Sequence, residues 1–160
     1  MDIFEFAMQM EKDGEAYYRE LSTKTPNRGI KKILITLADA EVIHYNIFQA
    51  MKKREQVPSP GSGRLAGIKN IFARLKEEGA SEVDASQIGQ YRKAQDIEKK
   101  SRDFYLEKAE ESKSETEKEI FLKIAHEEKK HYLILENIID FVNRPDTWLE
   151  DPEWYHLEEY

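Results

Sequence analysis

Two short segments of this chain carry a glutamate three residues before a histidine. They are Glu41-Val42-Ile43-His44 and Glu128-Lys129-Lys130-His131. On an α-helix three residues turn through about 300°, so both side chains lie on one face, about 4.5 Å apart along the axis, and can reach one metal ion. A single such pair means little in a glutamate-rich chain, and a third occurs at 153–156. The surrounding sequence must therefore distinguish the first two.

An internal repeat provides that distinction. Glu41 and Glu128 are 87 residues apart, and so are His44 and His131. The same shift, without a gap, aligns further identical residues: Glu11 with Glu98, Tyr18 with Tyr105, Ala7 with Ala94, Ile33 with Ile120, Ala38 with Ala125, and Tyr45 with Tyr132. A repeat of this kind predicts a duplicated helical hairpin.

Each half of the repeat contains two amphipathic stretches with apolar residues at steps of three and four. They predict helices near 3–28, 29–56, 84–112 and 115–143. Asp2 is a suitable N-cap, and the first helix should stop at about Lys24, because Pro26 disfavours helix at the residue before it. The short turn that follows makes the first two helices antiparallel neighbours. The expected fold is an all-α four-helix bundle of two antiparallel hairpins, in one domain over 1–160.

The two hairpins are joined by a connection at 57–86 that is too long for a simple turn. Leu65, Ile68, Ile71, Phe72 and Leu75 predict a short amphipathic crossover helix within it, closed by Gly79. The tail at 144–160 is aromatic, and Asp151-Pro152 indicates a last short helix. Packing or a dimer contact is the expected role of this tail.

Four glutamates lie inside the apolar stripes, where an ionised carboxylate costs several kcal/mol and neighbouring carboxylates raise one another's pKa. Two divalent cations would balance four carboxylates with neutral histidines. Mixed carboxylate and imidazole ligands suit iron, manganese or zinc. The predicted metal ligands are Glu11, Glu41, His44, Glu98, Glu128 and His131.

Several neighbouring residues have alternative interpretations. Glu127 competes with Glu128 as a ligand, but the repeat favours Glu128, and we expect metal to remain when Glu127 is removed. Tyr18 and Tyr105 are interpreted as core tyrosines bonded to ligand carboxylates rather than as radical sites. His126 is expected to be solvated, and His156 to serve the surface or packing.

Composition excludes other classes of protein. The chain has no cysteine, which excludes disulfides and iron–sulfur or cysteine-ligated zinc sites. Its net charge of −7 argues against nucleic-acid binding. No apolar run is long enough to span a membrane. We expect a cytoplasmic protein.

Taken together, Glu11-Lys12-Asp13-Gly14 with Tyr17-Tyr18, Glu41-x-x-His44, Glu98 with Phe104-Tyr105, and Glu128-x-x-His131 resemble the ferritin-like diiron proteins, and most closely the rubrerythrins. The resemblance covers about 3–142. It implies a ferritin-like bundle with two iron ions and chemistry on hydrogen peroxide or dioxygen. By position it implies that Glu41 and Glu128 bridge the metals and are the catalytic glutamates, and that Glu11 and Glu98 are terminal ligands.

The chain departs from the rubrerythrin pattern in two ways. It lacks the cysteines of a rubredoxin domain, so electrons must come from an external electron-transfer protein. Ser101 stands where rubrerythrins carry a further glutamate, which puts the redox-linked iron movement of that family in doubt. We expect an oxidoreductase that acts in defence against oxidative stress, as a homodimer. The alternatives are a ferroxidase that handles iron in a cage-forming oligomer, and a bundle in which the metal is only structural.

Overall fold

Four long helices and a shorter crossover helix account for most of the described residues. The structure is a computed structural model and describes residues 2–59, 65–78 and 84–143. The helices are α1 (Ile3–Lys24), α2 (Arg28–Lys53), α3 (Ala66–Glu78), α4 (Ile88–Glu111) and α5 (Glu115–Asn143), and a 3-10 turn, η1 (Ala85–Gln87), precedes α4. This confirms the predicted all-α class. None of these helices combines the length and apolar composition needed to cross a membrane.

Side-chain caps fix where the first two helices begin. The Asp2 carboxylate accepts a hydrogen bond from the Glu5 backbone N–H at 2.8 Å, so the predicted N-cap is confirmed. Asn27 caps α2 in the same way, accepting from the Ile30 N–H at 3.0 Å. Helix α1 ends at Lys24 rather than continuing to 28. Pro26 explains this, because it keeps Thr25 extended.

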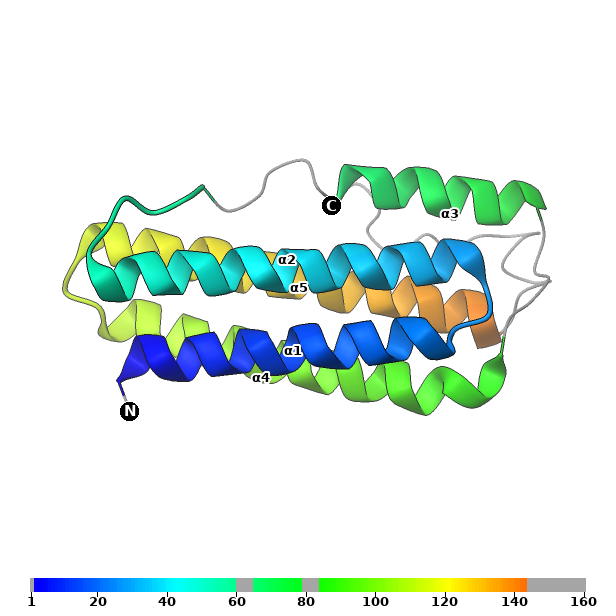
Figure 1. Cartoon of the computed structure of the whole chain (residues 1–160), viewed down its shortest axis with the longest axis horizontal. Helices are drawn as coiled ribbons and strands as arrows, with labels where there is room; N and C mark the ends of the chain where they lie inside the picture. The colour runs from blue at the N-terminus through cyan, green and yellow to red at the C-terminus, as the bar shows by residue number, and fades with distance from the viewer. Residues whose placement is uncertain (1, 60–64, 79–83, 144–160) are drawn as a thin grey trace.

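The helices pair as two antiparallel hairpins. Helix α1 packs along α2, and α4 packs along α5, with lesser contacts of α1 to α4 and of α2 to α5 (Figure 1). The path of the chain in Figure 1 makes α1 antiparallel to α4, and α2 antiparallel to α5. The repeated halves of the sequence therefore correspond to the two hairpins.

The crossover helix α3 lies against the outside of α2 (Figure 1). Its predicted apolar face is buried, namely Leu65, Ile68, Ile71, Phe72 and Leu75. Gly29 permits the close approach, because a Cβ there would lie 3.1 Å from a Leu75 methyl and 3.2 Å from an Ile71 methyl. Gly79, which was expected to close this helix, and the tail at 144–160 with its expected short helix and His156, lie outside the described residues.

Helix α4 begins later than predicted. Asp84 caps the 3-10 turn η1, and regular α-helix starts only at Ile88. The cause is a tertiary contact: the Gln87 side-chain amide donates to the Lys24 carbonyl at 2.6 Å, at the C-terminal end of α1. Periodicity alone does not reveal such a contact.

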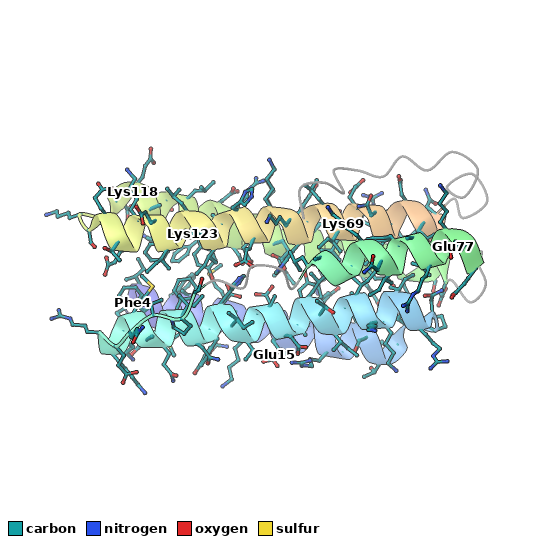
Figure 2. All side chains as sticks on the ribbon, turned by 90° about the horizontal axis from the view of Figure 1, so that it is seen from above. Phe4, Glu15, Lys69, Glu77, Lys118 and Lys123 are labelled. Carbon is teal, nitrogen blue, oxygen red and sulfur yellow. The ribbon has the colours of Figure 1, made fainter. Side chains whose placement is uncertain are left out.

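Two apolar clusters fill the bundle at opposite ends of the helices. One includes Leu34, Leu37 and Leu135, and the other includes Phe48 and Phe121. Figure 2 shows side chains filling the space between the two hairpins. The glutamates and histidines of the apolar stripes belong to neither cluster. They form a buried polar layer, and the clusters on either side keep water from it.

Candidate metal centre

The six predicted ligand side chains are all buried. Their exposed fractions are 1% for Glu11, 2% for Glu41, 1% for His44, 1% for Glu98, 1% for Glu128 and 0% for His131. Charged residues are almost never buried this completely without a partner. Since the six come from α1, α2, α4 and α5, each long helix contributes to the polar layer.

The side chains converge in two overlapping groups. The first is Glu11, Glu41, His44 and Glu128, and the second is Glu41, Glu98, Glu128 and His131. Within each group the nearest nitrogen and oxygen atoms all lie within 4.8 Å of one another. Glu41 and Glu128 belong to both groups. That sharing is what two bridging carboxylates require, with one histidine and one terminal glutamate on either side.

The histidines face the carboxylates through the same ring atom. His44 Nδ1 lies 3.0 Å from Glu128 Oε1 and 3.4 Å from Glu11 Oε2. His131 Nδ1 lies 3.4 Å from both Glu41 Oε1 and Glu98 Oε1. The two rings are nearly parallel, with centroids 5.9 Å apart. The Nδ1 lone pairs are thus directed into the same small volume as the carboxylate oxygens.

Six buried atoms in this volume make no hydrogen bond, one from each side chain. They are Glu11 Oε2, Glu41 Oε1, His44 Nδ1, Glu98 Oε2, Glu128 Oε1 and His131 Nδ1. An unsatisfied buried polar atom costs roughly 1–3 kcal/mol, and more if it is charged. Cations would satisfy all six atoms at once. The residues therefore fit a two-metal centre, and their oxygen and imidazole donors suit iron, manganese or zinc.

Without metal, bound protons offset part of the negative charge of the carboxylate cluster. Burial raises the pKa of Glu41 and of Glu128 well above 4.5, and the neighbouring glutamates raise both further. Burial alone would lower the pKa of His44, but the neighbouring carboxylates of Glu11, Glu127 and Glu41 together outweigh it and raise that pKa well above 6.5. Burial also opposes ionisation of Glu98, yet the His131 imidazole lowers the pKa of this carboxyl to about 2.

Two tyrosines hold the terminal glutamates, each across the bundle. Tyr18 donates to Glu98 Oε1 at 2.5 Å, and Tyr105 donates to Glu11 Oε1 at 2.6 Å. Burial raises the pKa of both hydroxyls well above 10, so they remain donors at neutral pH. Tyr18 and Tyr105 are equivalent positions of the repeat, and so are Glu11 and Glu98, so each hydrogen bond is the repeat equivalent of the other. This reciprocity shows that the hairpins are related by an approximate twofold axis.

Small residues make room for the cluster. A Cβ placed on Gly14 would lie 3.4 Å from the Glu41 carboxyl carbon, so a longer side chain here would displace that carboxylate. The position one turn after Glu98 is Ser101, which is 4% exposed. This buried position on α4 thus carries only a hydroxymethyl group.

Glu127 has a role that the sequence analysis missed. Its Oε2 lies 3.0 Å from His44 Nε2, the ring nitrogen that faces away from the cluster. Burial alone would raise the pKa of Glu127, but the contact with His44 lowers it. The sequence signal for this role is the doubled glutamate before Lys129-Lys130-His131, which the sequence analysis interpreted only as two competing metal ligands. His126 is exposed, as expected.

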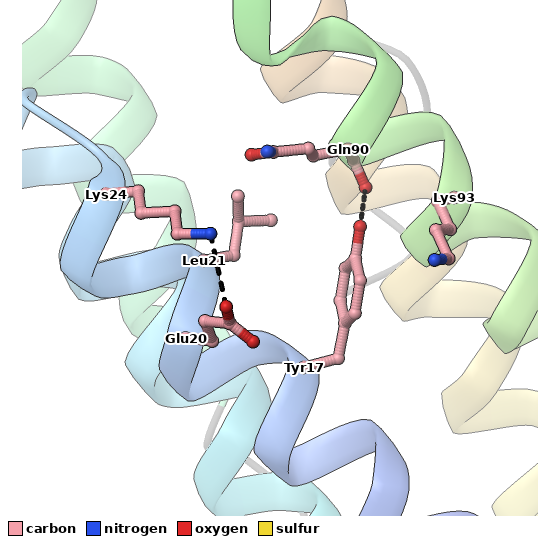
Figure 3. A pocket seen from close by; sticks show the side chains of 6 residues that line it. All are labelled: Tyr17, Glu20, Leu21, Lys24, Gln90 and Lys93. Atoms are coloured by element: carbon pink, nitrogen blue, oxygen red, sulfur yellow. Dashed lines mark hydrogen bonds and ion pairs between the residues drawn. The ribbon is translucent and has the colours of Figure 1, made fainter.

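A separate hollow lies at the surface between α1 and α4 (Figure 3). It is lined by Tyr17, Glu20, Leu21, Lys24, Gln90 and Lys93, and includes none of the six buried residues. The Tyr17 hydroxyl crosses it to donate to the Gln90 carbonyl at 2.7 Å, and Lys24 pairs with Glu20 (Figure 3). The Tyr17–Gln90 hydrogen bond connects the two hairpins away from the candidate metal centre, whereas the Lys24–Glu20 pair lies within α1.

Comparison with known families agrees with this geometry. The model of the rubrerythrin family matches residues 2–139, which includes all six buried side chains and all of α1 to α4. No curated protein and no solved structure matches the chain.

Proposed function

The chain belongs to the rubrerythrin family, and from that premise we propose that it is a diiron oxidoreductase that reduces hydrogen peroxide, or dioxygen, with electrons from a separate protein. The proposed ligands are the six buried side chains, with Glu41 and Glu128 shared between two iron ions. The observation that carries this proposal is the set of six buried atoms that make no hydrogen bond, one from each of these side chains.

The reaction needs two electrons and two protons for each hydrogen peroxide, and it yields two water molecules. Two iron ions held by these six side chains would supply the electron pair, because each can change its charge by one. The protein itself positions the ligand carboxylates and excludes bulk water. Tyr18 and Tyr105 fix the terminal carboxylates, and the apolar clusters around Phe48 and Leu37 keep bulk water from the centre.

The sequence contains no cysteine and so no ligands for a rubredoxin-type centre. This supports the proposal that a separate electron-transfer protein reduces the iron pair after each turnover. We expect the working form to be a homodimer, which sedimentation of the metal-loaded protein tests.

The proposal is tested by mixing anaerobic diferrous protein with hydrogen peroxide, and separately with dioxygen, while the ferric absorption is followed. We expect peroxide to react faster, and the reaction to stop after one turnover when no donor is supplied. Faster reaction with dioxygen would exclude hydrogen peroxide as the preferred oxidant and favour ferroxidase activity, the main alternative. If neither oxidant reacts, the metal is structural.

A further inference from the structure

The two buried histidines differ at the ring nitrogen that faces away from the carboxylates. His44 Nε2 lies 3.0 Å from Glu127 Oε2. His131 Nε2 is buried, and no hydrogen-bond partner for it exists among the described residues. The inner sides of the two rings are similar, because each Nδ1 lies within 3.4 Å of two carboxylate oxygens and the ring planes are nearly parallel. The main difference is on the outer side of each ring.

The repeat explains this difference. The shift of 87 residues that relates Glu41 to Glu128 also relates Ala40 to Glu127. Ala40 is buried on α2 and has no side-chain oxygen. The duplicated hairpins thus retain the metal-facing residues in both halves but supply a carboxylate acceptor to only one histidine.

We propose that Glu127 is a positioning residue for His44 that makes the two metal positions unequal, so that the position formed by Glu11 and His44 binds its ion more tightly than the position formed by Glu98 and His131. This inference rests on the proposed two-metal centre. The inference predicts which of the two metal positions fills first. The six ligands alone give no preference, because each position has the same kinds of ligand.

A histidine binds a metal ion as a neutral imidazole, which carries its one proton on either nitrogen. A cation can bind Nδ1 only when the proton is on Nε2. For His44, Glu127 accepts that Nε2–H, so the metal-binding tautomer keeps a hydrogen bond on its outer side. A hydrogen bond of this kind fixes the ring and increases the basicity of the ligating nitrogen.

His131 has no such outer acceptor. Its Nδ1 faces Glu41 and Glu98, whose oxygens are 3.4 Å away, but a proton on Nε2 meets no protein acceptor among the described residues. An ion on His131 Nδ1 would therefore leave a buried Nε2–H unpaired. Losing an outer partner of a metal-bound histidine typically costs 10–100-fold in affinity. We expect the two positions to differ by about this factor.

The test uses the full-length apo protein, labelled with ¹⁵N in its histidines and titrated with Zn²⁺ against a chelator of known affinity. In wild type we expect two ions to bind in two steps at least about tenfold apart. The ¹⁵N shifts should show the first equivalent on His44, with its proton on Nε2, while His131 still lacks metal.

Three variants complete the experiment. Glu127→Ala should weaken the tight step by about 10–100-fold while two ions still bind at saturation. Glu127→Gln retains an acceptor oxygen, so it should keep the His44 tautomer and lose less affinity. Glu119→Ala, an exposed residue on the same helix, should leave both steps unchanged.

Two results would overturn the inference and leave the proposed function standing: equal affinities for the two ions in wild type, or a tight step that Glu127→Ala does not change. A wild-type protein that binds fewer than two ions would contradict the two-metal centre itself, and with it the proposed function.

Discussion

Removing the hydroxyl of Tyr18 tests how the bundle tolerates its buried carboxylates. Tyr18 is 1% exposed and donates to Glu98 Oε1 at 2.5 Å. Because the pKa of Glu98 is lowered to about 2, this acceptor is ionised at neutral pH. Tyr18→Phe leaves the ring in place and deletes only the donor, so the change isolates one hydrogen bond to a buried charge.

The expected magnitude follows from that charge. Hydrogen bonds to charged groups contribute about 1.5–3 kcal/mol, against about 0.5–1.5 kcal/mol for neutral pairs. Tyr17→Phe is a matched control: the same chemical change at the adjacent residue, where the acceptor is the neutral Gln90 carbonyl at 2.7 Å and the site is only part-buried. We expect Tyr18→Phe to destabilise the apo protein by roughly 2 kcal/mol, about twice the effect of Tyr17→Phe.

The assay is urea denaturation of the apo proteins at pH 7, with thermal melting as a second measure. For a chain of this size, a loss of 2 kcal/mol corresponds to a fall of about 4–8 °C in Tm. Tyr105→Phe should behave like Tyr18→Phe, because the twofold axis gives it the equivalent bond to Glu11. Equal losses for Tyr17→Phe and Tyr18→Phe would refute the reasoning, since the ionised acceptor would then contribute nothing extra.

Three further predictions concern pH, metal and packing. The pKa values of Glu41, Glu128 and His44 are raised in the fold, so their stabilisation is complete below their unfolded values and is lost as pH rises through the folded ones. Apo stability should therefore fall above pH 4.5, the unfolded value of the two glutamates, with His44 adding to the loss above pH 6.5, and urea melts at pH 6 and pH 9 measure this. Glu128→Ala should lose both ions in metal analysis, because that carboxylate belongs to both groups, and retention of two ions would contradict its bridging role. Gly29→Ala should destabilise the protein by about 1–3 kcal/mol in urea melts by pushing Leu75 of α3 outward, and an unchanged or more stable variant would argue against the close α2–α3 contact.

Much of the fold was predictable because the same pattern of two amphipathic helices occurs twice in the sequence. The ungapped repeat of 87 residues predicted two hairpins, and the apolar stripes predicted the helix faces on which the six polar residues lie. Burial of Glu11 and Glu98 followed from their positions in those stripes, and the structure places both at 1% exposure. The expectation that these residues bind metal stays a prediction.

Contacts between hairpins were not predictable, because periodicity describes one helix at a time. Tyr18 is seven residues after Glu11, about 10.5 Å along the axis, so it cannot reach the glutamate of its own helix. It contacts Glu98 instead, because α1 and α4 run antiparallel. Gln87, which delays the start of α4 by contacting Lys24, and Glu127, which contacts His44, were missed for the same reason.

Anomalous diffraction from crystals of this protein loaded anaerobically with Fe²⁺ would locate the proposed metal ions directly. We expect two iron peaks inside the bundle, both between Glu41 and Glu128, with His44 Nδ1 bound to one and His131 Nδ1 bound to the other. A single buried peak, or iron found only at surface carboxylates while the six side chains remain unligated, would contradict this expectation.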